Sequence, residues 1–121
     1  MTPELVKLIP VIPSQDIDRD VAWYEKHAGF KLFYADKMYA VIYREQLVLH
    51  LQWHADNDDD PLLGGSVVRI HVKNIRPIFD EFVARGTVKP DALKLGTAWD
   101  TNEFGFYDLN RNAIFVMEDI E

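Results

Sequence analysis

The sequence repeats one pattern of secondary structure, and this repeat restricts the folds that the chain can adopt. A segment that begins at residue 12 matches a segment that begins at residue 70, at an offset of 58 residues. The matched pairs are Ile12 and Ile70, Asp16 and Asn74, Ile17 and Ile75, Val21 and Phe79, and Tyr24 and Phe82. Each pair joins a strand residue, a helix cap or a buried helix position to its counterpart. We interpret the chain as an internal duplication whose half-units bury their sheets together around a cleft.

The first half reads as a strand, a helix and three further strands. Residues 5–12, LVKLIPVI, are apolar and β-branched, but Pro10 has no N–H and is typical of an edge or exchanged strand. A helix follows, capped by Asp16 or Asp18 and ended by Gly29. Three short strands are predicted at residues 31–35, 39–43 and 47–53, the last two joined by the tight turn REQ.

The second half restarts after an acidic connector, ADNDDDPLLGG, that separates the two half-units. Its pattern predicts a strand in SVVRIHV, a helix in NIRPIFDEFVARG with Gly86 beyond its end, and a loop through Leu95. A strand near residues 104–108, the turn LNRN and the strand AIFVM complete it. We expect an α+β fold in one domain, residues 1–121, with modules at about residues 5–55 and 66–118.

Charge and composition exclude several classes of protein. The 20 acidic and 13 basic residues give a net charge of −7, which disfavours binding to nucleic acid or anionic membranes and favours a cationic ligand. The chain has no cysteine, which excludes disulfides and thiol nucleophiles. It also has neither a long apolar run nor a basic, apolar leader, so we expect a cytoplasmic location.

No motif in the sequence predicts a catalytic or metal centre. A phosphate-binding glycine loop, a G-x-S-x-G elbow and an H-E-x-x-H helix are all missing. His50 and His54 are four residues apart, but they lie on a predicted strand, and we favour edge or solvent histidines over a metal pair. The aspartates of residues 56–60 lack the alternating pattern of a calcium loop. We expect no metal and no cofactor.

Aromatic residues are the more informative set. Phe104 and Phe106 alternate along a strand, which favours core positions. Trp53 and Trp99 flank polar segments and carry an indole N–H, which leaves a ligand-facing or interface role open beside core packing.

Three stretches together resemble a known superfamily. IPVIPSQDIDRDVAWYEKHAGF, YAVIYREQLVLHL and AWDTNEFGFYDLNRNAIFVMED, in this order, are similar to the glyoxalase, bleomycin-resistance and extradiol-dioxygenase proteins, and most similar to the bleomycin resistance proteins. The resemblance implies two βαβββ modules that form a cup-shaped mixed sheet, and a homodimer with ligand crevices at the subunit interface. It also implies that Pro10 marks where the N-terminal strand crosses to the partner.

The resemblance also indicates whether this chain could bind the catalytic metal found in enzymes of the superfamily. Enzymes of this superfamily hold a metal with four inward side chains, and the matching positions here are Ile9, Leu49 or His50, Val67 and Phe115. At most one of these residues could be a ligand, and Glu118, at an odd displacement, should face the other side of the sheet. Resistance proteins likewise lack the metal and sequester a cationic, aromatic glycopeptide.

The resemblance also suggests a ligand site. Trp99 matches the tryptophan of a PWG loop that lines the drug crevice, and Tyr39 and Gln52 match positions near it. The ligand-binding candidates are Tyr39, His50, Gln52, Trp53, Trp99 and Phe104. Asp100 replaces the glycine of that loop and DLNRN replaces a DPAGN turn, so we expect a different loop shape and a different ligand.

Three functions are compatible with these residues. The first is a homodimeric protein that captures an aromatic, cationic small molecule, for which bleomycin-like antibiotics are the model. The second is a glyoxalase-like lyase or isomerase that uses His50 with a metal or as a general base. The third is an interaction domain of the same fold with a vestigial crevice.

Overall fold

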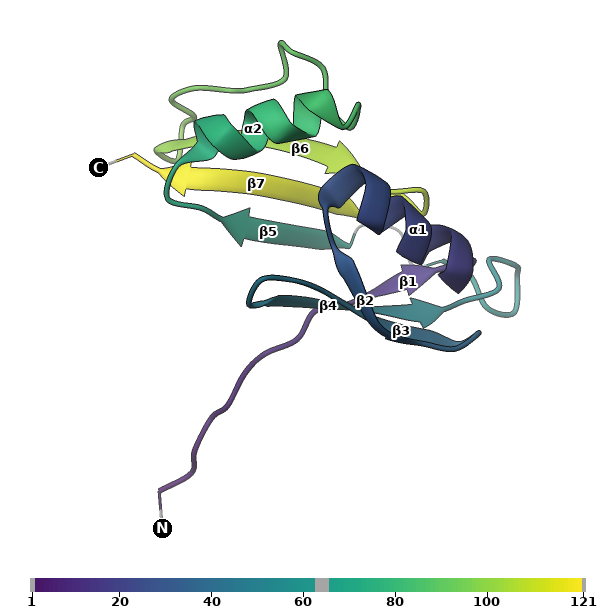
Figure 1. Ribbon diagram of the computed structural model, residues 1–121. Helices are drawn as coiled ribbons and strands as arrows, with labels where there is room; N and C mark the ends of the chain where they lie inside the picture. Colours follow the sequence, from purple (N-terminus) through teal and green to yellow (C-terminus); the bar gives the residue numbers. More distant parts are fainter. Residues whose placement is uncertain (1, 63–65, 121) are drawn as a thin grey trace.

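Two small sheets, each packed against one helix, form the computed structural model, which describes residues 2–62 and 66–120 (Figure 1). Sheet A has the strand order β1-β4-β3-β2, and sheet B has the order β5-β7-β6. The strands of sheet A are β1 (Val11–Ser14), β2 (Lys31–Ala35), β3 (Tyr39–Arg44) and β4 (Leu47–Trp53). Those of sheet B are β5 (Val67–His71), β6 (Thr101–Tyr107) and β7 (Ala113–Asp119). Helix α1 (Ile17–Ala28) lies on sheet A and helix α2 (Ile75–Ala84) lies on sheet B.

The two halves share one topology, as the repeat predicts. In each sheet the strand before the helix pairs in parallel with the last strand, β1 with β4 and β5 with β7, and the remaining pairs are antiparallel. Sheet B differs in one respect: a single antiparallel bridge from Lys94 to Glu103 stands where sheet A has a fourth strand. The predicted α+β class is confirmed. No described helix has the length and apolar composition needed to cross a membrane.

Both helices begin at the matched cap positions, but they are capped differently. Asp16 caps α1 through its side chain, which accepts a hydrogen bond from the Arg19 N–H at 3.1 Å, and Gly29 ends the helix with φ 72°. Asn74 caps α2 without a side-chain bond. The Glu118 carboxylate of β7 instead accepts from the Ile75 N–H at 2.8 Å, so Glu118 faces the helix side of sheet B, as predicted.

The core lies between the sheets and the helices. On sheet A, alternate residues of β3 and β4 are buried towards α1, and they join helix residues from both halves in one apolar cluster. The strand residues of this set are Ala40, Ile42, Leu49 and Leu51, and the helix residues include Ile17, Tyr24, Phe79 and Phe82. The face of sheet A away from α1 is called the outer face below, and the face of sheet B away from α2 is named in the same way.

Polar side chains hold the C-terminal end of α1 against the second half. The Arg85 guanidinium donates to the carbonyl oxygens of Glu25 and Lys26, at 3.4 and 3.0 Å. Thr87 Oγ1 donates to the carbonyl of His27 at 2.6 Å. Arg44, which lies on β3 in the first half, donates to the carbonyl of Ala28 at 3.0 Å and to the Glu81 carboxylate of α2 at 2.7 Å. The last four carbonyls of the helix therefore all accept from side chains.

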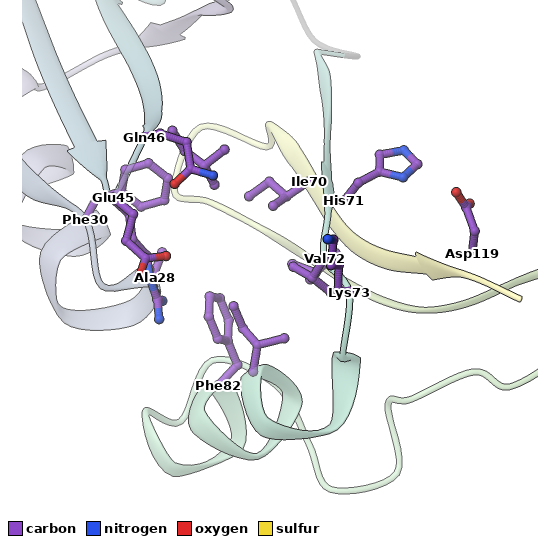
Figure 2. A pocket seen from close by; sticks show the side chains of 14 residues that line it. Ala28, Phe30, Glu45, Gln46, Ile70, His71, Val72, Lys73, Phe82 and Asp119 are labelled. Atoms are coloured by element: carbon purple, nitrogen blue, oxygen red, sulfur yellow. Dashed lines mark hydrogen bonds between the residues drawn. The ribbon is translucent and has the colours of Figure 1, made fainter.

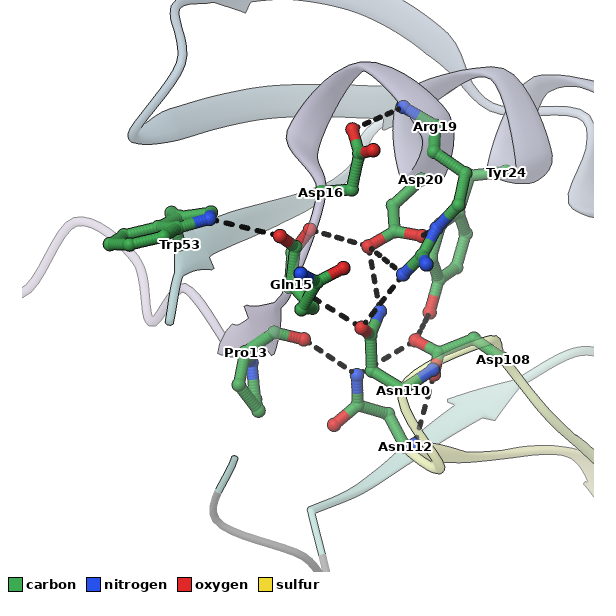
Figure 3. A network of polar contacts seen from close by, with 11 residues as sticks. Pro13, Gln15, Asp16, Arg19, Asp20, Tyr24, Trp53, Asp108, Asn110 and Asn112 are labelled. Carbon is green, nitrogen blue, oxygen red and sulfur yellow. Dashed lines mark hydrogen bonds and ion pairs between the residues drawn. The ribbon is translucent and has the colours of Figure 1, made fainter. Parts of the chain in front are cut away.

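A buried polar network holds the N-terminal end of α1 against the turn between β6 and β7 (Figure 3). The Asn110 side chain donates to the buried Asp20 carboxylate at 2.7 Å and accepts from the Gln15 N–H at 3.0 Å. Ser14 Oγ also donates to Asp20. Tyr24 donates its phenol to Asp108 at 2.6 Å. Burial, with Asp108 close by, raises the pKa of Tyr24 well above its usual value, so this donor keeps its proton.

The N-terminal run differs from its prediction. The first strand begins at Val11, whereas the apolar pattern predicts a start at residue 5. The His50 N–H donates to the Pro10 carbonyl, and beyond that point residues 2–10 leave the sheet and extend away from the body (Figure 1). Leu5 and Leu8 are each 95% exposed. Apolar side chains form a strand only where a partner strand is present, and no strand among residues 2–62 and 66–120 pairs with residues 5–9. Residues 63–65 of the predicted connector lie outside the described residues.

Loss of the Asn110 side chain should destabilise the fold. Asn110→Ala removes the neutral donor to Asp20 and the acceptor of the Gln15 N–H, both in a buried network, and should cost about 2–3 kcal/mol in the free energy of unfolding. Asn74→Ala is the matched control because the Asn74 side chain makes no cap bond, and it should cost less than about 0.5 kcal/mol. Urea unfolding followed by circular dichroism measures both. Equal effects of the two substitutions would contradict the role given to Asn110.

Glu81 should contribute to the acid sensitivity of the fold. Its hydrogen bonds to Arg44, and secondarily to Arg85, lower the pKa of the Glu81 carboxyl. A lowered folded pKa stabilises the protein at pH values above the unfolded pKa, and this contribution is lost as the pH falls through the folded pKa. Between neutral pH and about pH 3, Glu81→Gln should therefore lose less stability than the wild type.

Urea midpoints measured across this pH range test the expectation. Glu25→Gln serves as the control, because the Glu25 carboxylate has no hydrogen bond or ion pair within the described residues. If Glu81→Gln loses as much stability as the wild type when the pH falls, the ion pair of Glu81 with Arg44 does not contribute to acid sensitivity.

Candidate functional site

The outer face of sheet A brings three of the six ligand candidates together. Tyr39 lies opposite Gln52 in the pairing of β3 with β4, and His50 lies opposite Val41. Because directly opposed residues share a face, Tyr39, His50 and Gln52 all lie on the side away from α1. The same register decides between the two alternatives for the metal position on β4: Leu49 is buried in the core and His50 is on the outer face.

Tyr39 and His50 form a hydrogen-bonded pair on this face. The Tyr39 hydroxyl lies 2.7 Å from His50 Nδ1, and the two rings meet edge to face with centroids 5.3 Å apart. When the phenol donates to Nδ1, the imidazole proton sits on Nε2 and offers a donor at the opposite edge of the ring. The pair is therefore suited to bind the polar groups of a ligand whose rings pack on the same face.

A cavity of about 640 Å³ lies over the outer face of sheet A and contains His50. Its walls are apolar and aromatic with a few polar groups: Lys7, Phe33, Val41, Tyr43, Glu45, Gln46, Val48 and His50. Phe33 is 74% exposed because the register of β2 shifts between Leu32 and Tyr34. Sequence reasoning missed Phe33 as a site residue, because a bulge of this kind leaves no signal in the alternation of the strand. A cavity with this lining is typical of a small-molecule site.

Trp53 and Phe104 lie elsewhere. Trp53 is on the α1 side of β4, and its indole N–H donates to the Gln15 carbonyl at 2.9 Å (Figure 3). Phe104 is 1% exposed and packs edge to face against Phe79 and Phe82 of α2, with centroids 5.3 and 5.6 Å away. The core position that alternation predicts for Phe104 is therefore confirmed, and its inclusion among the ligand candidates is wrong because the side chain lies under α2.

Trp99 lies at the tip of a tight turn between the Lys94 bridge and β6. The indole is 62% exposed. The Thr97 N–H donates to the Thr101 carbonyl at 2.9 Å, and the Asp100 N–H donates to the Thr97 carbonyl at 3.1 Å. Asp100 has φ 61° and Arg111 has φ 65°, the left-handed conformation in which glycine is usual. At both places where this sequence replaces a glycine of the resembled motifs, the new residue thus takes a glycine-like conformation.

The outer face of sheet B carries a stacked arginine. The Arg69 guanidinium lies 4.9 Å from the centre of the Phe115 ring and 3.5 Å from the Glu103 carboxylate, whose side chain is only 5% exposed. Phe115 lies flat over Gly105, where an added Cβ would approach the ring to 2.7 Å. Arg69, Phe115 and Gly105 form one cross-strand row, so the sheet register fixes the stack.

The side chains present do not fit the metal of the superfamily's enzymes. Four positions match the metal ligands of those enzymes. Ile9, Val67 and Phe115 have hydrocarbon side chains, and only His50 has an atom that could coordinate a metal. Within residues 2–62 and 66–120, no three His, Asp or Glu side chains converge as a metal site. His54 is engaged separately, with Nδ1 2.7 Å from the Asp60 carboxylate.

A second cavity of about 610 Å³ lies between the two halves (Figure 2). It is lined by residues of the β3–β4 turn, the end of α1, β5 and α2, among them Gln46, Phe30, Ile70 and Phe82. It contains none of the six ligand candidates, and half of its lining residues belong to the apolar core. The outer face of sheet A is therefore the better candidate site.

Known proteins share this fold and, more weakly, this sequence. The bleomycin resistance protein of Geobacillus stearothermophilus is 23% identical over 131 residues, covering 97% of this chain and 99% of its own. A bleomycin-binding protein solved in complex with bleomycin has a TM-score of 0.80 at 19% identity, covering 95% of this chain and 99% of its own. A glyoxalase/bleomycin resistance protein/dioxygenase from Nocardioides has a TM-score of 0.76 at 14% identity, covering 100% of this chain and 87% of its own. No protein-family model matches the sequence.

The chain therefore shares its fold with these glyoxalase and bleomycin-binding structures. The sequence similarity to the bleomycin resistance protein extends over nearly the whole chain.

Substitution by alanine should destabilise the protein much more at the buried Phe104 than at the exposed Trp99. Phe104→Ala should lower the free energy of unfolding by about 3–5 kcal/mol, because it opens a cavity under α2. Trp99→Ala should change it by less than about 1 kcal/mol, since most of the indole is exposed. Urea unfolding of the two variants measures the difference. A large loss at Trp99 would show that the indole is packed in the folded protein.

Proposed function

We propose that this chain is a metal-independent small-molecule binding protein that sequesters an aromatic, cationic ligand in the manner of the bleomycin resistance proteins. The observation that carries the proposal is the cavity on the outer face of sheet A, which is lined by Phe33, Tyr43 and His50, with Tyr39 hydrogen-bonded to His50 on the same face. Such a face binds by stacking and hydrogen bonding. The similarity to bleomycin resistance proteins supports the ligand class, and the net charge of −7 favours a cation.

The proposed ligand contacts come from both halves of the chain. Tyr39 and His50 would hydrogen-bond polar arms from sheet A, with Gln52 beside them and Phe33 as a stacking surface. Trp99 would cover a planar ring from the second half, where its exposed indole leaves one face open. We place this activity in the cytoplasm, where sequestration would give antibiotic resistance.

The proposed crevices lie between two copies of the chain. Leu5, Val6 and Leu8 project from residues 2–10 with exposed fractions of 95%, 83% and 95%. An extended apolar arm of this kind is stabilised when it adds to a partner's sheet. Pro10 stands where the arm leaves sheet A, the place that strand exchange requires. A partner would also close the open side of each outer face.

An enzyme of the same fold is the second candidate, because His50 and Tyr39 are within hydrogen-bond distance of each other. An imidazole with a fixed partner is a usual general base. Metal analysis of the purified protein and a pH–rate profile of any turnover test this alternative. A titrating rate that His50→Gln abolishes would favour the enzyme.

Calorimetric titration with metal-free and copper-loaded bleomycin tests the binding function. We expect heat at micromolar protein concentration, and about a 10-fold or greater loss of affinity in Trp99→Ala and Tyr39→Ala. Leu109→Ala is the control, since Leu109 is exposed on the β6–β7 turn outside the proposed site. Sedimentation equilibrium measures the oligomeric state of the same samples.

Two results would contradict the proposal. No heat with a folded protein would remove bleomycin as the ligand, and a monomer at micromolar concentration would remove the shared crevice.

A further inference from the structure

The turn of residues 97–101 carries two exposed side chains that are adjacent in the sequence, the indole of Trp99 and the carboxylate of Asp100. The Asp100 N–H donates to the Thr97 carbonyl at 3.1 Å, and the Asp100 carbonyl accepts from the Ile120 N–H at 2.9 Å. Thr97 Oγ1 accepts from the Thr101 N–H at 3.1 Å. Hydrogen bonds therefore hold the backbone on both sides of Trp99 and Asp100, and the two side chains project from an ordered tip.

The Asp100 carboxylate has no evident structural task. It is exposed, and among the described residues it makes no hydrogen bond or ion pair. Its backbone has φ 61°, a conformation that any side chain makes less favourable than glycine does, although Asp and Asn tolerate it best. A glycine would therefore satisfy the turn, and what the aspartate adds at this tip is a negative charge.

We propose that Trp99 and Asp100 form a recognition element for a positively charged group of the ligand, such as an alkylammonium, a sulfonium or an aromatic quaternary nitrogen. The inference rests on the proposed function, in which Trp99 contacts the ligand. A cation over the indole is attracted to the π face, and a carboxylate one residue away adds Coulomb attraction that a neutral ligand does not receive. Asp100 thereby sets a preference for cationic over neutral aromatic ligands of equal size.

A pair of small probes tests the preference directly. N-methylquinolinium carries a permanent charge, and quinoline is its uncharged counterpart at mildly alkaline pH. Each is titrated into the full chain while the indole N–H signal of Trp99 is followed by NMR, with Trp99→Phe used to assign that signal. We expect the wild type to bind the cation about 5-fold more tightly than quinoline, and Asp100→Asn to reduce the ratio to about 1–2 without changing quinoline affinity.

Two glycine variants separate charge from backbone conformation. Asp100→Gly and Arg111→Gly both relieve a left-handed non-glycine residue and should each raise Tm by about 2–5 °C. Only Asp100→Gly should also lose the cation preference, since Arg111 lies in the β6–β7 turn. Stability and cation preference should thus change in opposite directions at Asp100 alone.

The outcomes distinguish this inference from the proposed function. If the preference survives in Asp100→Asn, or if neither probe shifts the Trp99 signal, the inference is overturned even when bleomycin binds through Trp99. If the preference depends on Asp100 while bleomycin gives no heat, the inference stands and bleomycin is the wrong ligand.

Discussion

The hydrogen bonds at the two ends of α1 hold the halves of the chain in one arrangement, and the rest of the structure depends on them. Its last carbonyls accept from Arg44, Arg85 and Thr87, and its first turn is joined to the β6–β7 turn through Asn110. An apolar interface between helices and sheets tolerates small shifts. Buried polar groups tolerate them less, because each unpaired group costs about 1–3 kcal/mol. The polar contacts therefore select one packing among those that the apolar core would allow.

This arrangement leaves two open sheet faces with different chemistry. The outer face of sheet A offers aromatic rings and the Tyr39–His50 pair, and that of sheet B offers a guanidinium held on Phe115. The Tyr39–His50 pair and Arg69 are each held by neighbours in the same sheet, so these side chains have less entropy to lose on binding. Neither face surrounds a ligand by itself, which is why a cover from a second chain or from the Trp99 turn matters to the proposed function.

The sequence predicts what is local and misses what depends on distant partners. Asp16 and Gly29 bound α1 because a cap and a left-handed terminator act within one turn. The alternation of β3 and β4 likewise places Tyr39, His50 and Gln52 on one face. The start of β1 at Val11, the bulge that exposes Phe33 and the bonds of Asn110 depend on strands and turns far away in the chain. For Phe104, alternation alone predicts the core position that is observed, and the packing against α2 excludes the ligand contact suggested beside it.

Asp100 and Arg111 show that a non-glycine residue can occupy a left-handed turn position when nearby hydrogen bonds hold the backbone. Each replaces a glycine of the resembled motifs, which predicts a different loop, yet each keeps a positive φ. The hydrogen bonds of the turns account for this, because Thr97, Thr101 and Ile120 fix the backbone around Asp100, and Asp108 and Asn112 do so around Arg111. Breaking such bonds would cost more than one left-handed residue does. The hydrogen bonds of the two turns thus hold a non-glycine residue at a positive φ, and the Asp100 and Arg111 side chains add charge where a glycine would add none.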